Sequence, residues 1–130
     1  MKKIVSGAAV MVAAAGSLLA ATAAPANAYQ DYYYYGAIAL SPSTGHIGYS
    51  YDYSDSPSAQ NAAMSSCPQA DCHIVARFAN GCGAIAYSSR DGYYTFGAAS
   101  SRSAAKSQAL GRNSGDATII HWNCTTGYEL

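Results

Sequence analysis

Charged side chains are scarce in this chain of 130 residues, since only 11% are Asp, Glu, Lys or Arg. Seven basic residues balance seven acidic ones. Two of the basic residues, Lys2 and Lys3, lie in a segment that we expect to be removed, which leaves five basic residues against seven acids. Binding to a phosphate backbone requires a clustered basic face. The composition therefore argues against a nucleic-acid-binding protein.

The motifs that identify common enzymes are also missing. The chain has no G-x-S-x-G, no H-E-x-x-H and no glycine-rich phosphate loop. His46, Ser50 and Asp52 together suggest a hydrolase, but they lie on one predicted strand, where His46 and Ser50 are about 13 Å apart. A nucleophile and its base must lie within hydrogen-bond reach. We therefore predict no catalytic residue, no cofactor and no metal site, and we favour a non-enzymatic protein while leaving an enzyme open.

What is present begins with an N-terminal segment typical of export. Two lysines precede an apolar run over residues 4–24, and alanines lie three and one residues before the Ala28–Tyr29 bond. This pattern predicts a signal peptide over residues 1–28. The alternative is an uncleaved membrane anchor, because a run of about 20 apolar residues is long enough to span a bilayer. Its many Ala, Ser, Gly and Thr residues disfavour the anchor. We expect a secreted or cell-envelope protein with no membrane span after cleavage.

The mature part contains four cysteines: Cys67, Cys72, Cys82 and Cys124. An even number in an exported chain of this size predicts two disulfides. A four-cysteine zinc site is the alternative, but such sites favour two closely spaced cysteine pairs. Cys82 and Cys124 are far apart in the sequence, which disfavours zinc.

The mature chain resembles one unit written twice. The sequence Gly-Ala-Ile-Ala at residues 36–39 recurs at residues 83–86, and each copy is followed by a turn that ends in glycine, a strand-like stretch, an alanine-rich segment and an apolar run. This pattern predicts an α+β fold of two tandem strand-hairpin-strand-helix-strand repeats, which form one small disulfide-stabilised sheet-and-helix domain. The predicted organisation is a signal peptide, a tyrosine-rich extension, a domain of two repeats and a C-terminal tail: residues 1–28, 29–34, 35–124 (repeats 35–81 and 82–124) and 125–130.

The first copy also predicts local structure. Residues 46–53 alternate between a face with three tyrosines and a face of His, Gly, Ser and Asp, which predicts a strand with its aromatic face buried and its polar face exposed. The following helix is expected to have Ser56 as its N-cap and Pro57 at its first position.

The repeat predicts how the cysteines pair. Cys67 corresponds to Asn113 and Cys72 to Ala117, so the second copy lacks both of these cysteines together. Residues that disappear as a pair are expected to be bonded as a pair. This reasoning predicts the disulfides Cys67–Cys72 and Cys82–Cys124.

Two histidines are candidates for a binding site. His121 corresponds to Ala76 in the repeat, and we expect it on the inward strand face that Ile119 shares. It is then either a core histidine hydrogen-bonded to a neighbour or a histidine with a perturbed pKa in a small pocket. His46 is expected to be a solvated strand residue.

Tyrosine is the strongest oddity of composition, with 12 residues in all, five of them in residues 29–35. Tyrosine offers flat contact area and a hydroxyl group, and it is favoured at interfaces. Tyr32, Tyr33 and Tyr34, with Tyr51 and Tyr53, are therefore candidate contacts to a protein or a cell-wall glycan. The alternative is that the N-terminal tyrosines form a strand extension or a tail with a purely structural role.

Several of these motifs together resemble a bacterial secreted family called domain of unknown function 4189. They are the sequence Tyr-Gly-Ala-Ile-Ala from residue 35, Gly-Tyr-Ser from residue 48, the alanine-rich helix ending at Cys67, Asp-Cys-His-Ile-Val from residue 71, Phe78, and Cys-Gly-Ala-Ile-Ala from residue 82. The chain departs from the family pattern where the family has further cysteines, at Asn113 and Ala117, and where it often has tryptophan, at Tyr49 and Phe96. The resemblance implies export and a disulfide-bonded repeat fold, and it implies no activity.

Two hypotheses for the function remain. The leading one is an exported binding or interaction module at the cell envelope, since tyrosines are abundant and a catalytic constellation is missing. The other is a small secreted enzyme, or an inhibitor of one, that uses His46 or His121.

Overall fold

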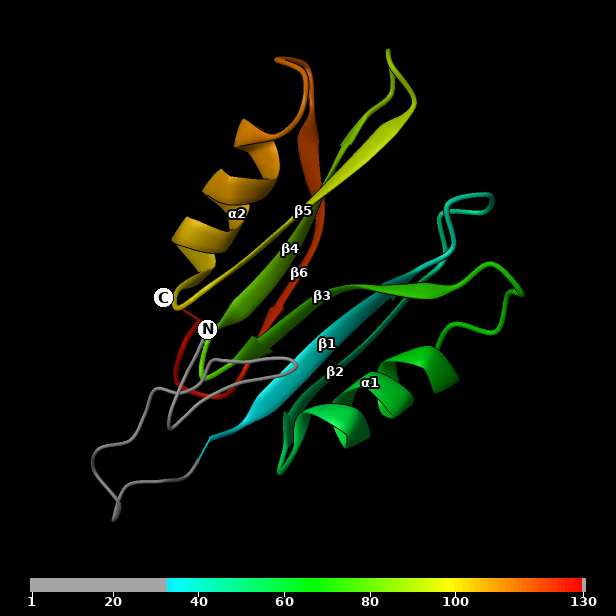
Figure 1. Ribbon diagram of the computed structural model, residues 1–130. Helices are drawn as coiled ribbons and strands as arrows, with labels where there is room; N and C mark the ends of the chain where they lie inside the picture. Colours follow the sequence, from blue (N-terminus) through cyan, green and yellow to red (C-terminus); the bar gives the residue numbers. More distant parts are fainter. Residues whose placement is uncertain (1–32, 130) are drawn as a thin grey trace, which may run out of the picture. The chain divides into compact units, whose positions relative to one another are not determined.

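The computed structural model describes residues 33–129, which contain six strands and two helices (Figure 1). In chain order these are β1 (Tyr35–Leu40), β2 (Ile47–Tyr53), α1 (Ser56–Ser65), β3 (His73–Ala79), β4 (Cys82–Ser88), β5 (Tyr93–Ala99), α2 (Arg102–Gly111) and β6 (Thr118–Cys124). The predicted α+β class is confirmed. The predicted signal peptide and the first part of the tyrosine-rich extension, including Tyr32, lie outside the described residues.

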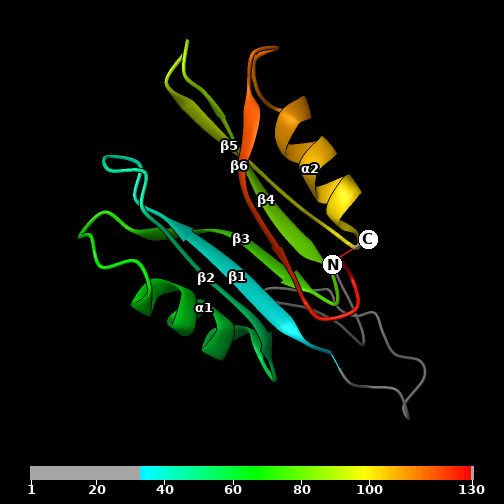
Figure 2. The ribbon, with the colours of Figure 1, turned by 180° about the vertical axis from the view of Figure 1, so that it is seen from behind.

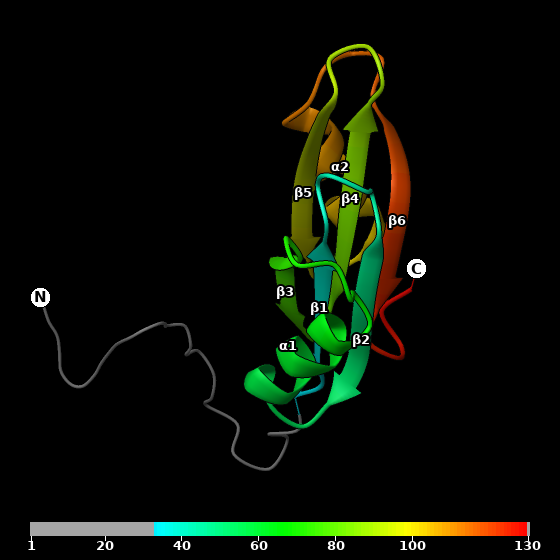
Figure 3. The ribbon, with the colours of Figure 1, turned by 90° about the vertical axis from the view of Figure 1, so that its right-hand side faces the viewer.

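The strands form two antiparallel sheets of three strands each, with the orders β2-β1-β3 and β5-β4-β6. Each sheet is covered on its outer face by one helix, α1 on the first sheet and α2 on the second, and the inner faces of the two sheets meet (Figures 1 and 2). The side view shows the strands of both sheets running roughly along one direction (Figure 3). The core between the sheets is built from four buried side chains: Ile38, Ala76, Phe78 and Ile85.

Each helix packs close to its sheet because the residues on both sides of the contact have small side chains. Ala59 and Ala63 of α1 are fully buried against Ala37 and Ala39 of β1. On β2, a Cβ atom added to Gly48 would lie only 2.2 Å from the Ala63 carbonyl oxygen. Alanine-rich helix faces therefore determine which residues the sheet can place beneath them.

This close contact overturns the prediction for β2. Gly48 and Ser50 are buried beneath α1, whereas Tyr49 and Tyr51 of the other face are exposed, as is Tyr53 beyond the register shift. The predicted period of two is present, but the aromatic face is not the buried one. The space under α1 accommodates a glycine and a serine, whose hydroxyl donates to the Ala59 carbonyl at 2.6 Å, and no aromatic ring.

The N-cap of α1 is Asp55 and not Ser56, so that prediction is wrong by one residue. Asp55 has extended backbone angles, φ −149° and ψ 159°, and its carboxylate accepts from the Ser58 amide at 2.8 Å. An aspartate two positions before proline satisfies a free amide of the first turn, and a carboxylate at a helix N-terminus is favoured by the helix dipole. Ser56 is already helical.

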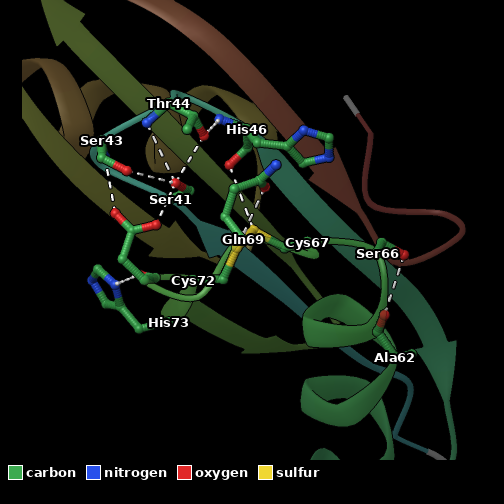
Figure 4. Close-up of a disulfide and its surroundings, with 11 residues drawn as sticks. Ser41, Ser43, Thr44, His46, Ala62, Ser66, Cys67, Gln69, Cys72 and His73 are labelled. Carbon is green, nitrogen blue, oxygen red and sulfur yellow. Dashed lines mark hydrogen bonds between the residues drawn. A yellow bond between two sulfur atoms is a disulfide. The ribbon is translucent and has the colours of Figure 1, made fainter.

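The four cysteines form the two predicted disulfides. Cys67–Cys72, the short-loop disulfide, joins the end of α1 to the segment before β3 and spans a sequence separation of 5 (Figure 4). Cys82–Cys124, the long-loop disulfide, joins directly opposite residues of β4 and β6 across a separation of 42. In the second half, where the short-loop disulfide has no counterpart, the Asn113 side-chain amide lies 2.9 Å from Thr95 Oγ1 and thereby ties the end of α2 to β5.

The residues after β6 pack against the domain. Thr125 is fully buried, its amide donates to the Gly81 carbonyl at 2.8 Å, and its hydroxyl accepts from the Gly81 amide at 3.0 Å. The start of the predicted C-terminal tail is thus fastened to the turn between β3 and β4.

Candidate functional site

The candidate site lies where β2 of the first sheet meets β6 of the second, and we call it the β2–β6 seam (Tyr49, Ser50, His121 and Asn123). The rings of Tyr49 and His121 are 4.9 Å apart and tilted by 45°. His121 Nε2 lies 2.9 Å from Asn123 Oδ1, and the other end of the Asn123 amide donates to the Ser50 carbonyl at 3.0 Å. Asn123 and Ser50 are both buried. One hydrogen-bonded chain therefore connects the two sheets through the seam.

His121 faces the other sheet, as expected for an inward side chain, but Ile119 does not share its face. A register shift between the pairs Ile85–His121 and Ala86–Ile119 places one extra residue in β6. Such a bulge reverses which side of the sheet the following side chains face. Ile119 packs with the core beneath α2, whereas His121 contacts Tyr49 of the other sheet. The two residues therefore do not share a face.

The surroundings of His121 define its protonation state. Burial lowers the pKa of His121 below its ordinary value of 6.5, and the hydrogen bond to Asn123 opposes this shift only in part. A histidine with a lowered pKa is neutral at pH 7. Of the two alternatives drawn from the sequence, the histidine bonded to a neighbour is present, and its pKa is also perturbed.

The seam holds no nucleophile for His121 to activate. The Ser50 hydroxyl points to the other side of the strand, where it donates to the Ala59 carbonyl of α1. Within residues 33–129, no hydroxyl group forms a hydrogen bond with a histidine ring. Nucleophilic catalysis by a hydroxyl that a histidine activates requires such a contact.

Tyrosines line the outer side of the seam. On β2, the side chains of Tyr49, Tyr51 and Tyr53 are 48%, 49% and 39% exposed. Tyr33 and Tyr34, which precede β1, are also exposed. Tyr49 and Tyr51 are alternate residues of the strand and share one face, whereas the register shift beside Asp52 turns Tyr53 away from them. We call these three exposed residues of β2 the tyrosine row (Tyr49, Tyr51 and Tyr53).

The end of the tyrosine row is fastened by Asp52. This residue has a positive φ of 63° and lies beside a register shift in the β1–β2 pairing. Its carboxylate accepts from the Thr126 amide at 2.9 Å and from the Thr126 hydroxyl. The segment after β6 therefore holds this end of β2 in place, and Asp52 is occupied within the chain.

His46, the other histidine candidate, lies apart from the seam residues. It is exposed in the turn before β2, next to the short-loop disulfide (Figure 4). In the same region the Ser41 hydroxyl donates to Asp71 at 2.6 Å, and the Ser43 amide donates to the other carboxylate oxygen at 3.0 Å. These bonds lower the pKa of Asp71 to about 2. The group fastens the β1–β2 turn to the segment before β3 and is structural.

Sequence reasoning missed the tryptophan of β6. Trp122 lies beneath the guanidinium of Arg102 at 4.8 Å and the ammonium of Lys106 at 5.4 Å from its ring centroid. Beside it is an open cavity of about 370 Å³ that Ile119, Ile120, His121, Trp122 and Lys106 line. Cation–π contacts of this kind stabilise the packing of a helix on a strand, which is the role that the geometry supports. The single tryptophan of the chain was a signal that could have found this position.

Two further findings concern the described part of the chain. Residues 33–129 contain no group of three or more His, Cys, Asp or Glu side chains arranged to hold a metal ion. Among the same residues, neither helix is long and apolar enough to cross a membrane.

Known proteins give the fold a context. The chain is similar to the protein in the NMR structure of Rv1813c from Mycobacterium tuberculosis, with 25% sequence identity and a TM-score of 0.60, and the alignment covers 94% of this chain and 99% of that chain. No curated protein matches the chain. The family model Domain of unknown function (DUF4189) matches residues 35–124, which include the β2–β6 seam. The protein therefore belongs to the DUF4189 family.

Proposed function

We propose that this protein is an exported, non-enzymatic binding module whose tyrosine row is the contact surface. The observation that carries the proposal is the exposure of three tyrosines of one edge strand, next to a seam without a nucleophile. Exposed aromatic rings that could have been placed in a core indicate an interaction site. The partner we infer is a protein or a cell-wall glycan, and nucleic acid is not expected.

Export is part of this proposal. The N-terminal pattern over residues 1–28 supports a cleaved signal peptide. The two disulfides indicate an oxidising environment, because disulfides persist outside the cytosol. We infer that the mature protein starts at Tyr29 and acts outside the cell or at its envelope.

We also infer that residues 35–81 and 82–124 are two copies of one ancestral unit. Support comes from the strand pairings, since Ile38–Ala76 followed by Ala39–Ile74 in the first sheet corresponds to Ile85–His121 followed by Ala86–Ile119 in the second. The register shift thus falls at the same place in both sheets. The helix contacts support the inference as well, because each helix covers one glycine and one hydroxyl-bearing residue. These are Gly48 and then Ser50 on β2, and in the opposite order Thr95 and then Gly97 on β5.

Binding to isolated cell-envelope fractions tests the function. The double variant Tyr51→Ser and Tyr53→Ser removes two rings of the tyrosine row without touching the core. Removing one aromatic ring from an interface costs about 1–2 kcal/mol, so we expect retention on the fractions to fall by at least about tenfold. Tyr93→Ser is the matched control, because Tyr93 has the same 49% exposure as Tyr51 but lies on β5. Equal retention of wild type and the double variant would contradict the proposal.

The hypothesis of a small secreted enzyme has less support. His121 is neutral and bonded to Asn123, and the nearest serine hydroxyl faces α1. A catalytic role for His46 lacks a neighbouring acid, because Asp71 is bonded to Ser41 and Ser43.

A further inference from the structure

Strand edges are where this fold is open. Among residues 33–129, β2 and β5 are edge strands at corresponding places in the two sheets. An edge strand presents unpaired N–H and C=O groups, which template pairing with another strand unless the protein covers them. The two halves of the chain treat this edge differently.

On β5, helix α2 covers the edge. The Arg112 guanidinium donates to the Phe96 carbonyl at 2.6 Å, and the Ala98 amide donates to the Gln108 side-chain oxygen at 3.0 Å. Both backbone groups point away from β4, so they are the groups that an added strand would use. Gln108 of α2 and Arg112, the residue just after this helix, thus satisfy this part of the β5 edge.

On β2, the corresponding groups belong to Tyr49 and Tyr51. Ile38 pairs with Tyr49 in the first sheet as Ile85 pairs with Phe96 in the second. The Ser41 amide donates to the His46 carbonyl, and bonded and non-bonded pairs alternate along an antiparallel ladder. The backbone groups of Tyr49 and the amide of Tyr51 therefore point away from β1.

Helix α1 has no side chain to cover them. The two helices can be aligned by their N-caps, Asp55 and Ser101, and by their buried alanines, Ala59 and Ala105. In this alignment Ala62 corresponds to Gln108, and Ser66 corresponds to Arg112. Ala62 has no polar group, and the Ser66 hydroxyl donates back to the Ala62 carbonyl. In the part of the chain that the structure describes, the Tyr49 carbonyl and the Tyr51 amide form no hydrogen bond with a side chain.

The uncovered stretch is neutral and aromatic. Residues 47–51 are Ile-Gly-Tyr-Ser-Tyr, with no charged residue and no proline. Edge strands that avoid pairing carry lysine, proline, inward charges or a β-bulge. Residues 47–51 contain no charge and no proline, and the register shift of β2 falls only after Ser50. The nearest charge, Asp52, is bonded to Thr126. The stretch itself therefore contributes no charge repulsion between two copies.

We propose that β2 is a self-association edge, at which β2 of one copy pairs antiparallel with β2 of a second copy. With a two-fold axis beside Tyr49, the two Tyr49 residues face each other and Ile47 faces Tyr51 of the second copy, so one stretch complements itself. Each bonded pair exchanges two backbone hydrogen bonds, and opposed tyrosines on one face add cross-strand contact. The free groups are backbone donors and acceptors at strand spacing, which a polypeptide matches and a glycan does not. This inference rests on the proposed function in one respect, that β2 is the contact surface.

Covering the edge tests the proposal. The variant Ala62→Gln with Ser66→Arg transfers the two side chains that cover β5 to the matching positions in and just after α1, both of them outside the core. The control variant Asn61→Gln with Ser65→Arg makes the same additions on the solvent side of α1. The oligomeric state of the mature protein is measured by sedimentation velocity over a wide range of concentrations, and hydrogen exchange of the Tyr49 and Tyr51 amides is measured by NMR.

We expect wild type and the control to form dimers in which both amides are protected from exchange. The covered variant should raise the dimer dissociation constant by more than about tenfold. Tyr49→Pro provides a second test, because it removes an amide that points away from β1 and leaves the β1–β2 ladder intact. A wild type that stays monomeric at all concentrations would overturn the proposal, as would a dimer that both variants leave unchanged. Amides protected only after envelope extract is added would also overturn it, in favour of a foreign strand at the same edge. That last result would leave the proposed binding function standing, whereas a dimer without envelope binding would remove the proposed function alone.

Discussion

One added methyl group at Gly48 measures how closely α1 lies on its sheet. A Cβ atom at this position would lie 2.2 Å from the Ala63 carbonyl oxygen and 2.9 Å from the Ser66 carbonyl carbon. Both of these atoms belong to the backbone at the end of α1, so no side-chain rotation relieves the overlap. In Gly48→Ala the helix and strand must separate by about 1 Å to reach van der Waals distance.

The cost follows from what the separation disturbs. The hydrogen bond from the Ser50 hydroxyl to the Ala59 carbonyl, 2.6 Å long, lies in the same contact, and its loss costs about 1 kcal/mol. Forcing extra volume into a close-packed contact costs about 1–3 kcal/mol. We therefore expect Gly48→Ala to lower the free energy of unfolding by about 3 kcal/mol. For a domain of this size that corresponds to a fall in Tm of about 15 °C.

Thermal unfolding of the oxidised protein, followed by circular dichroism, provides the measurement. The control is Gly111→Ala at the end of α2, where an added Cβ meets nothing within 4 Å, and we expect its effect to stay within about 0.5 kcal/mol. Gly97→Ala should behave as Gly48→Ala does, since its Cβ would lie 2.1 Å from the Ala105 carbonyl oxygen. If Gly48→Ala proved as stable as Gly111→Ala, the close helix–sheet contact would be refuted.

Three other predictions concern the cross-links and the titrating groups. Replacing both cysteines of the long-loop disulfide by serine should cost about 4 kcal/mol, against about 2 kcal/mol for the short-loop disulfide, and urea unfolding at neutral pH compares them; an equal cost would contradict the loop argument. Asp71 has a pKa of about 2 in the folded protein against an ordinary value of 3.8. Its contribution to stability is therefore complete above pH 3.8 and is lost as the pH falls towards 2. Asp71→Asn should remove this part of the acid sensitivity, and an unchanged acid unfolding profile would refute the role of the hydrogen bond from Ser41. The pKa of His121 in the folded protein is lowered from 6.5. Its contribution to the free energy of unfolding is therefore complete above pH 6.5 and is lost as the pH falls below that value, because the unfolded chain binds the proton more readily. An NMR titration of the ring that gave a pKa at or above 6.5 would contradict the burial described for the seam.

The sequence predicted the α+β class and the cysteine pairing correctly. Both predictions were drawn from the internal similarity of the sequence. The prediction for the orientation of β2 was wrong. A period of two in hydrophobicity shows that the two faces of a strand differ, but it does not show which face meets a helix. The alanines of α1 held the missing information, since a helix whose contact face is Ala59 and Ala63 approaches too closely for tyrosine, and only a glycine and a serine fit beneath it.

The candidate site was predictable only in part. Tyr51, Tyr53 and His121 were singled out from the sequence and do lie on the two strands of the seam, but Ile119, which was expected on the inward face with His121, lies on the other side of the sheet. The cause is the register shift in β6, and a bulge of one residue leaves no mark in a short apolar run. Asn123, the hydrogen-bond partner of His121, could not be identified from the sequence either. Every second residue of a regular strand lies on the same face, and the pattern does not show which of these residues the histidine contacts.

The two halves of the chain differ at the edge on which the proposed self-association rests. Both halves place small residues under their helix and hold their first turn with a serine–aspartate hydrogen bond, Ser41 to Asp71 and Ser88 to Asp116. Features that serve folding are therefore common to both. The halves differ at the outer edge of the second strand, where β5 is covered by Gln108 and Arg112 and β2 is bare and lined with tyrosines. An uncovered edge is a hazard for a protein that has no use for it. Because two side chains suffice to cover the edge of β5, the bare edge of β2 supports the proposed pairing with a second copy.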